Sequence, residues 1–382
     1  MEKIFEALGY MVSEKKPLEN HLSIQFLYIP NKDGSKRWIW PASAGKPYFL
    51  KFYNISNLKS KLIAFCIKLV FVFKLQRLFF KSQNIFYSQI SDKQFFEMNS
   101  DWALFTGTAG PNNKAIVYVK KHDTSCFIKV ALTEQAKTLL KHEKFVLNRL
   151  FYSSPVTFDF PSTVATTNDT LTLSDLSEGG RRESKLSDLH MNTLIELNEI
   201  SSFSTPLYNF EPWKQLKCEL ELLETLDDCR IPKGMIRKLK DIIHSRNTDS
   251  KIEVSLCHGD FTPWNIYQNE EKLQIYDWEL SQPFMPIGHD AFHFIMQQGI
   301  LVERKNWKQI KKDIDHQLKS GNFKAISKFK NEDMEEYLQL YLLFNTITHL
   351  KLYAKQLKWH EQVFWMLNVW NDAITSFTVD IK

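Results

Sequence analysis

The stretch Leu256–Glu279, LCHGDFTPWNIYQNEEKLQIYDWE, contains the residues whose types and spacing could perform chemistry. His258, Asp260 and Asn265 follow one apolar run in the order H-x-D-x-x-x-x-N, and Asp277 follows the next apolar run. The pattern predicts strand, polar loop, strand, turn and strand, with the polar residues where strands end. This order is typical of a phosphoryl-transfer loop, in which one Asp faces the attacking hydroxyl while an Asn and a second Asp hold magnesium.

Asp260, Asn265 and Asp277 have the residue types that this chemistry requires. Mg²⁺ prefers hard oxygen ligands, a few from protein and the rest from water and phosphate, which an amide oxygen and a carboxylate would supply. Asp260, at the near end of the loop, can accept a hydrogen bond from a substrate hydroxyl and take its proton. The alternative is a polar surface hairpin with a core His, which would not need these residues in this order.

The segments HGDFTPWN and IYDWE resemble the aminoglycoside phosphotransferase and choline kinase family, small-molecule relatives of the protein kinases. Members have Asp-Trp or Asp-Phe where protein kinases have Asp-Phe-Gly, and this chain has Asp277-Trp278-Glu279. The later PIGHDAF, Pro286–Phe292, is similar to a family segment whose Asp, here Asp290, stabilises the catalytic region. We find no Ala-Pro-Glu element, which disfavours a protein kinase regulated by loop phosphorylation.

The resemblance implies an α+β, bilobal, protein-kinase-like fold. A small antiparallel β lobe would sit on a mostly helical large lobe, with ATP in the cleft between them. The resemblance starts near Phe96, so we expect an N-terminal extension of strands and an apolar helix over 1–95, a kinase-like small lobe over 96–175, and a helical lobe with the catalytic loop over 176–382.

Lys129 lies in the middle of an apolar strand predicted over Cys126–Ala131, where a charge calls for an anionic partner. The following helix, predicted over Glu134–Leu150, has Glu143 in its middle. Lys129 and Glu143 match the kinase pair that positions the ATP phosphates. Glu134 is the rival partner, although an acid in the first helical turn already stabilises the helix dipole. The alternative is that Lys129 and Glu143 are both surface charges.

Two loops of the predicted small lobe are candidates for further ATP contacts. Gly107, Thr108 and Gly110 lie in a turn between strands predicted over 102–105 and 114–119, where glycines would let backbone N–H groups approach a phosphate. The full G-x-G-x-x-G is missing, so an ordinary hairpin turn remains an alternative. The resemblance places the hinge and its adenine contacts at Ser174–Gly180, with Ser174, Asp175 and Leu176 as ATP-binding residues.

The apolar segment Leu62–Phe80 is predicted to be one helix. Lys68, Lys74 and Arg77 interrupt it, and each costs about 2.5–3.5 kcal/mol near a bilayer centre, against gains of about 0.3–0.6 for an apolar residue. Three alternatives stay open: a helix buried or packed on a partner, a helix lying on a membrane surface, and a true span.

The remaining polar and aromatic candidates surround the loop. We expect His258 and Asp290 to brace the loop rather than to react. Trp264, Trp278 and Phe284 could stack on a sugar or surround a quaternary ammonium. Glu279 could bind metal or substrate, or it could be a solvated charge. Downstream of the hinge, helices are predicted over 185–200, 212–225 and 235–243, and amphipathic helices over 306–318, 331–356 and 360–377.

The composition sets limits on partners and compartment. A formal net charge of +5, from 49 basic and 44 acidic residues, is not the footprint of a nucleic-acid binder. Five scattered cysteines without CxxC spacing indicate free thiols in a reducing cytosol. The N-terminus lacks a basic start followed by an apolar run, so no signal peptide is expected. We therefore expect a cytoplasmic protein, with membrane association through 62–80 as an alternative.

These observations predict an ATP- and Mg²⁺-dependent kinase of a small-molecule hydroxyl. A sugar or cell-envelope saccharide precursor is the first choice of substrate and a choline-like amino alcohol the second. A polycationic aminoglycoside would want an acidic cleft, which this mildly basic chain does not suggest. Two other classes stay open: a catalytically silent, pseudokinase-like ATP-binding module, and a membrane-surface scaffold.

Overall fold

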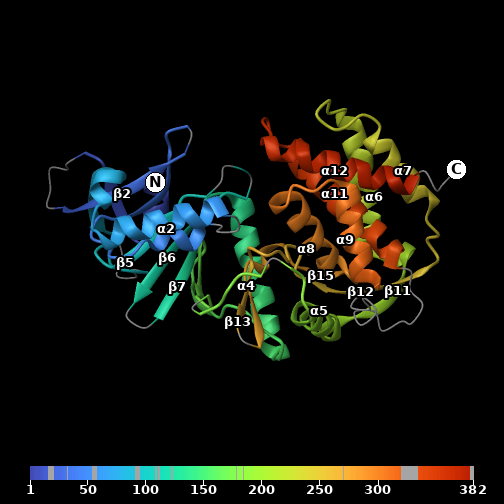
Figure 1. Cartoon of the computed structure of the whole chain (residues 1–382), viewed down its shortest axis with the longest axis horizontal. Helices are drawn as coiled ribbons and strands as arrows, with labels where there is room; N and C mark the ends of the chain where they lie inside the picture. The colour runs from blue at the N-terminus through green and yellow to red at the C-terminus, as the bar shows by residue number, and fades with distance from the viewer. Residues whose placement is uncertain are drawn as a thin grey trace. The chain divides into compact units, whose positions relative to one another are not determined.

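The structure, a computed structural model, describes residues 1–15, 21–31, 33–53, 58–90, 95–107, 110, 112–121, 124–177, 179–183, 185–269, 271–319 and 334–378. The chain forms two compact units. The first comprises Met1–Tyr152 and Phe160–Glu178, and the second comprises Ser153–Asp159 and Gly179–Lys382. Helices and strands occur in both units, so the expected mixed α+β class is confirmed (Figure 1).

The first unit is built on one large antiparallel sheet. Among the described residues nine strands pair in the order β1-β4-β2-β3-β5-β6-β7-β10-β9, each antiparallel to its neighbours. The strands are β1 (Tyr10–Ser13), β2 (Leu22–Pro30), β3 (Lys36–Pro41), β4 (Lys81–Gln89), β5 (Asp101–Phe105), β6 (Lys114–Lys121), β7 (Thr124–Ala131), β9 (Thr163–Thr166) and β10 (Thr170–Ser174). The helices are α1 (Glu2–Ala7), the 3-10 helix η1 (Tyr48–Phe52), α2 (Leu58–Val72), α3 (Gln76–Phe79) and α4 (Glu134–Ser153).

Each face of this sheet carries its own apolar core. Successive strand residues point to opposite faces, so Phe26 and Trp102 enter one core while Leu27 and Ala103 enter the other. Helix α1 covers the first core, and η1 with Phe71 of α2 covers the second. In Figure 1, α2 lies over one face of this sheet.

Strands from the first ninety residues are part of the same sheet as the strands that follow. The junction is the pairing of β3 with β5, in which Trp38 lies opposite Phe105 and Ile39 opposite Leu104. The predicted strands over 102–105, 114–119 and 126–131 are present as β5, β6 and β7. The division into 1–95, 96–175 and 176–382 stays a prediction of domain bounds.

The apolar segment 62–80 is not the single helix that its composition predicts. Helix α2 ends at Val72, α3 begins at Gln76, and Lys74 between them adopts a left-handed conformation with φ 56°. That residue cannot continue a right-handed helix, so the chain turns there. Within the described residues, no helix is both long enough and apolar enough to cross a membrane.

The second unit combines two small sheets with a set of helices. One sheet has the order β11-β12-β15 and is antiparallel; the other has the order β13-β14-β8, with β14 and β8 parallel. The strands are β8 (Phe158–Asp159), β11 (Phe203–Pro206), β12 (Lys251–Cys257), β13 (Ile266–Asn269), β14 (Lys272–Ile275) and β15 (Gln282–Pro286). The helices are α5 (Asp188–Ser201), the 3-10 helix η2 (Leu207–Asn209), α6 (Glu211–Leu226), α7 (Met235–Ser245), the 3-10 helix η3 (Trp278–Leu280), α8 (His289–Gln297), the π-helix η4 (Gln298–Val302), α9 (Trp307–Lys319), α11 (Met334–Ala354) and α12 (Glu361–Thr378).

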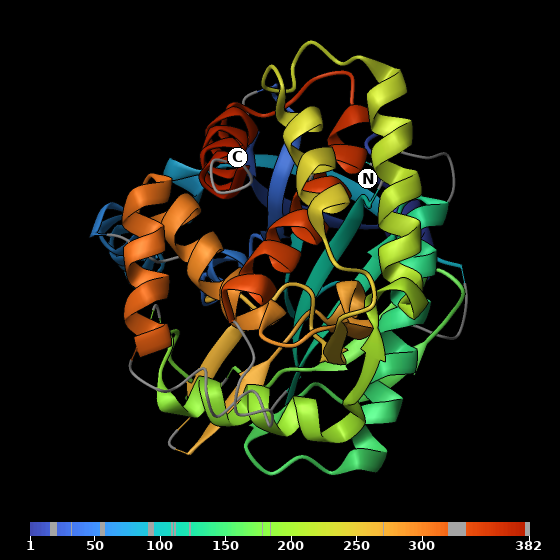
Figure 2. The same ribbon diagram turned by 90° about the vertical axis from the view of Figure 1, so that its right-hand side faces the viewer.

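Helix α11 is the central helix of the second unit. It is buried along most of its length and packs against α6, α8 and α12 (Figure 2). The six predicted helices are present, although the expected start of one, at 331–333, lies outside the described residues. The sequence pattern did not reveal β11, β15 or α8. Helix α8 has only nine residues, which is too short for a helical period to stand out, and all of them are buried.

Candidate active site

Lys129 and Glu143 form a buried ion pair in the first unit. The Lys129 Nζ lies 2.7 Å from each Glu143 carboxylate oxygen, and the two residues are 6% and 0% exposed. Strand β7 places Lys129 opposite Leu171 of β10, and α4 carries Glu143 on its buried side. Bidentate pairing of this kind fixes the ammonium group, because burying either charge alone would be costly.

This pairing decides between the alternatives for Lys129. The rival Glu134 is bound instead to Lys137, and its side chain is 88% exposed. Lys129 and Glu143 are also not surface charges, since both are buried. The ion pair is therefore the one expected from kinases, whereas its contact with ATP stays a prediction.

Asp260 and Asn265 are joined within the loop that connects β12 to β13. The Asn265 amide nitrogen donates to the Asp260 carboxylate at 2.8 Å and to the Asp260 main-chain oxygen at 3.1 Å. The Asn265 N–H donates to the Thr262 carbonyl, and its carbonyl accepts from the Tyr276 N–H. The loop is therefore a closed turn that holds the Asp260 carboxylate from one side.

Asp290 and His258 hold this loop in place through hydrogen bonds to its backbone. The Asp290 carboxylate accepts hydrogen bonds from the backbone N–H groups of His258, at 2.7 Å, and Gly259, at 3.0 Å, and from the Cys257 thiol. The fully buried His258 ring accepts from the Asp260 N–H through Nδ1, so its Nε2–H donates to the Tyr276 carbonyl at 2.9 Å. Burial and the adjacent Asp290 charge raise the pKa of the Cys257 thiol well above its usual value, which keeps it protonated.

Gly259 is required by the backbone between His258 and Asp260. Its φ is +80°, and a Cβ at this position would lie 2.3 Å from the Leu280 carbonyl oxygen. Any side chain would therefore push the loop away from η3. The H-x-D pattern specifies no residue type between His258 and Asp260. Glycine is the residue type that this close contact requires.

Asp277 and Glu279 place two carboxylates at the end of β14. Asp277 has φ 65° and precedes η3, and each residue has a carboxylate oxygen within 4.8 Å of the other's. Glu279 is 8% exposed, so its interpretation as a solvated charge is wrong. Two acids this close, one of them buried, are suited to a shared cation.

The aromatic residues near the loop differ in exposure. Trp278 is fully buried, donates to the Ile275 carbonyl and packs against Phe158 and His258, so the expectation that it faces a ligand is wrong. Trp264 and Phe284 are half-buried. Their contact with a substrate remains a prediction.

His293 and Tyr341 are residues of the loop environment that the sequence pattern missed. The His293 Nε2 lies 3.4 Å from the Asp260 Oδ1, and the Tyr341 hydroxyl lies 3.3 Å from the His293 Nδ1. Burial and the negative charge of Asp290 raise the pKa of Tyr341 well above its usual value, so its hydroxyl stays protonated and can donate. Lone residues of these types on apolar helices are usual in cores. An H-x-x-x-H spacing at 289–293 could have pointed to His293, but no local pattern singles out Tyr341.

The predicted glycine turn is only partly described. Gly107 has φ +85°, and a Cβ there would lie 2.1 Å from the Lys114 carbonyl, whereas a Cβ at Gly110 would meet nothing within 4 Å. Thr108 lies outside the described residues.

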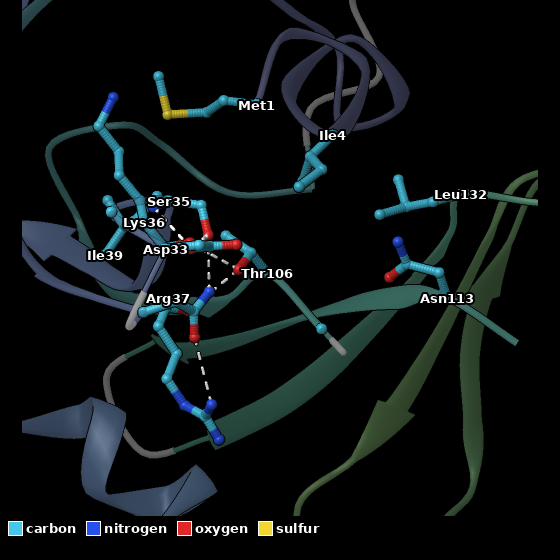
Figure 3. Close-up of a pocket in the computed structure, with 13 residues that line it drawn as sticks. Met1, Ile4, Asp33, Ser35, Lys36, Arg37, Ile39, Thr106, Asn113 and Leu132 are labelled. Carbon is cyan, nitrogen blue, oxygen red and sulfur yellow. Dashed lines mark hydrogen bonds between the residues drawn. The ribbon is translucent and has the colours of Figure 1, made fainter. Parts of the chain in front are cut away.

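A hollow of about 600 Å³ opens beside Gly107, walled by the β2–β3 turn and by Thr106 and Asn113 (Figure 3). Polar side chains of its wall already form hydrogen bonds with one another, since Arg37 and Ser35 both bond to the Asn31 side chain. Lys129 and Glu143 are not among its lining residues, so we do not assign ATP to this hollow.

Asp175, in the predicted hinge, is held by a residue from the N-terminal segment. Its carboxylate accepts from Lys51 Nζ at 3.2 Å, from the Ser125 hydroxyl at 2.9 Å and from Ser177. Burial alone would raise the pKa of Asp175, but the Ser177 hydrogen bonds and the Lys51 charge outweigh it and keep the pKa below its usual value. The side chain therefore has a structural use, and adenine contacts at Ser174, Asp175 and Leu176 stay a prediction.

Comparisons with known proteins identify a fold but no close relative. No protein-family model matches the sequence, and no curated protein matches it significantly. The structure is similar to choline kinase LicA from Streptococcus pneumoniae, with a TM-score of 0.50 and 12% identity over 72% of this chain and 93% of that chain. Spectinomycin phosphotransferase APH(9)-Ia, in complex with ADP and spectinomycin, gives a TM-score of 0.46 at 13% identity, over 72% and 93%. A choline/ethanolamine kinase family protein from Mesorhizobium loti gives 0.42 at 13%, over 71% and 87%.

The likeness to the choline kinase shows that this chain has the same fold. The resemblance of HGDFTPWN and IYDWE to the aminoglycoside phosphotransferase and choline kinase family is thereby confirmed at the level of fold. At 12% identity it does not transfer a substrate.

Proposed function

We propose that the chain is an ATP- and Mg²⁺-dependent phosphotransferase acting on a hydroxyl of a small molecule. The observation that carries the proposal is the Asp260 carboxylate held at 2.8 Å by Asn265, in a loop braced by Asp290. A polar surface hairpin would not need a buried acid beneath its turn. The choline-kinase fold supports taking the first unit as the counterpart of the small lobe and the second as that of the large lobe.

We assign to Asp260 the hydrogen bond to the acceptor hydroxyl. Its carboxylate would accept the hydroxyl proton, or orient it, as the oxygen attacks the γ-phosphoryl group. Asn265 holds one oxygen of this carboxylate, and His293 lies near the other, so its direction is set before substrate binds. Lys129, fixed by Glu143, is assigned the phosphates of ATP.

The residues after the loop fit a magnesium ion. Asn265 uses its amide nitrogen for Asp260, which leaves the amide oxygen as the atom to offer a cation, and Asp277 and Glu279 add carboxylates. These are hard oxygen donors of the kind Mg²⁺ takes. When bound, the ion would neutralise charge on the transferring phosphoryl group.

A sugar or a cell-envelope saccharide precursor remains the first choice of substrate. The mildly basic composition argues against a polycationic aminoglycoside. The burial of Trp278 leaves Trp264 and Phe284 as the aromatic side chains that could stack on a sugar or surround a quaternary ammonium. We place the reaction in the cytoplasm, where ATP is supplied.

The proposal is tested by a phosphoryl-transfer screen of sugars, amino alcohols and aminoglycosides with the full chain and its Asp260→Asn variant. Transfer should require Mg²⁺, and its rate should fall by roughly 10²- to 10⁴-fold in the variant, which is the usual contribution of a positioned general base to the rate. Asp249→Asn, a change at an exposed acid, serves as the control and should leave the rate unchanged.

Equal rates for the parent and Asp260→Asn on a true substrate would refute the role of Asp260. Magnesium-dependent ATP binding without transfer to any acceptor would favour the pseudokinase-like alternative, for which the incomplete glycine turn is the main argument.

A further inference from the structure

Helix α2 has two apolar faces, and the sheet uses only one of them. Ala64 and Phe71 are buried, and Phe71 belongs to the core on one sheet face with Ile67 packed against it. On the other side, exposed apolar residues recur with spacings of four and three: Leu58, Leu62, Phe65, Leu69 and Val72. That spacing keeps side chains on one face of a helix.

The exposed apolar residues continue past the end of α2. Phe73, Leu78 and Phe79 are 66%, 80% and 66% exposed. Singly exposed apolar residues are common, but a full helical face followed by further exposed aromatic residues marks an interaction site. We call the exposed apolar residues of 58–79 the α2–α3 surface.

The charged residues of this segment and of the sequence on either side of it are all basic. No acidic residue occurs between Asp33 and Asp92, although the whole chain is nearly balanced at 49 basic and 44 acidic residues. The basic residues of the α2–α3 segment and its flank are all exposed: Lys59, Lys61, Lys68, Lys74, Arg77 and Lys81. At about 3.6 residues per turn, Lys61 and Lys68 fall at one edge of the exposed apolar face and Lys59 near the other.

We propose that the α2–α3 surface binds the face of an anionic lipid bilayer, with α2 lying in the plane of the membrane. Helices with an apolar face edged by Lys and Arg bind in this way, because the apolar side chains enter the acyl boundary while the cations reach the headgroups. A helix of 15 residues is about 22 Å long, against about 30 Å for the hydrocarbon core, which suits a position along the surface.

The charge also distinguishes a bilayer from a second copy of the chain. Two copies meeting through this surface would bring the same cations together without acidic residues to pair them, and like charges repel. An anionic leaflet attracts each of these cations instead. This inference does not depend on the kinase assignment.

The experiment is vesicle co-sedimentation of the full chain with phosphatidylcholine vesicles and with vesicles containing one quarter phosphatidylglycerol. Binding should be at least about tenfold stronger to the anionic vesicles and should weaken as salt is raised. Phe65→Ser/Val72→Ser should reduce binding at least about tenfold, since exposed apolar area is lost. Lys61→Glu/Lys68→Glu should reduce it by a similar factor on anionic vesicles only.

Two matched controls use exposed residues of the second unit. Leu222→Ser/Leu226→Ser repeats the apolar change on α6, and Lys217→Glu/Lys233→Glu repeats the charge change. Both should bind as the parent does, and all variants should keep the parent's thermal unfolding midpoint. The proposal is overturned by no binding to either vesicle, by equal binding to both, or by α2 variants that bind as the controls do. It is also overturned if the α2 changes abolish a dimer rather than lipid binding.

Discussion

The side-chain amide of Asn265 donates to Asp260 twice, at 2.8 Å to the carboxylate and at 3.1 Å to the main-chain oxygen. One residue thus sets both the direction of the acid and the shape of the turn that carries it. Because both bonds use the nitrogen, the amide oxygen remains for a cation. If the proposed magnesium site is right, orientation of the acid and binding of the metal would be coupled through this single side chain.

This coupling predicts a double effect of Asn265→Ala. The rate of phosphoryl transfer should fall by about 10²-fold, because the carboxylate loses its positioning donor. The Mg²⁺ concentration for half-maximal rate should rise, because one oxygen ligand is lost. Steady-state rates measured across a Mg²⁺ titration separate the two effects.

Asn269→Ala, at the exposed end of β13, is the control and should change neither quantity. A slower Asn265→Ala enzyme with an unaltered Mg²⁺ dependence would rule out the metal role while leaving the positioning role intact.

His293 is predicted to be a positioning residue for Asp260, which it approaches at 3.4 Å. His293→Ala should lower kcat by roughly tenfold with little change in KM, because the substrate still binds but the acid is less well directed. Tyr341→Phe, which removes the hydroxyl 3.3 Å from His293, should have a smaller effect in the same direction.

A purely structural role for His293 would give a different result. The variant would then have a lower unfolding midpoint and an unchanged kcat for the folded fraction. Measuring both quantities on one preparation distinguishes the two roles.

The buried Lys129–Glu143 pair predicts a marked asymmetry between single and double changes. Glu143→Ala should lower the free energy of unfolding by about 3–5 kcal/mol, because it removes the carboxylate whose two oxygens lie 2.7 Å from the buried Lys129 ammonium. Lys129→Met/Glu143→Leu should recover most of that stability, since apolar side chains of similar volume replace both charges. The double variant should nevertheless bind ATP poorly. Urea unfolding and nucleotide titration measure the two properties.

Glu134→Ala on the same helix is the matched control. Its ion pair with Lys137 is largely exposed, so we expect no measurable change in stability. If Glu143→Ala also left the free energy of unfolding unchanged, Lys129 and Glu143 would not form a buried ion pair.

Two buried histidines predict a loss of stability in mild acid. Burial lowers the pKa of His190 and of His289 from 6.5 to about 4. Between these values the unfolded chain takes up protons that the folded chain does not, so stability falls as the pH drops from about 6.5 to about 4. Each group contributes at most about 3 kcal/mol over that range.

His190→Gln should therefore flatten the dependence of unfolding free energy on pH by up to about one proton. The measurement is a set of urea unfolding curves between pH 7.5 and pH 4. His244→Gln, at an exposed position on α7, should leave the slope as it is. A slope that stays the same in His190→Gln would show that this ring is not the source of the acid sensitivity.

The sequence by itself determined the features that depend on short spacing. The strand that carries Lys129, the helix that carries Glu143 and the H-x-D-x-x-x-x-N loop could all be read from local periodicity and residue order. These patterns are local because a strand repeats every two residues and a helix about every 3.6. They also sufficed to recognise the family whose fold the structure shows.

Only the tertiary structure decided which of these residues meet and which are buried. Periodicity could not choose between Glu134 and Glu143, show that Trp278 is in the core, or bring Tyr341 to His293, 48 residues away. It also joined Leu62–Phe80 into one helix, whereas Lys74 turns the chain and one face of α2 stays exposed. The physical reason is that burying a charge or a ring costs free energy, and pairing it with another group recovers some of that free energy. Both quantities depend on neighbours that packing brings from distant parts of the chain.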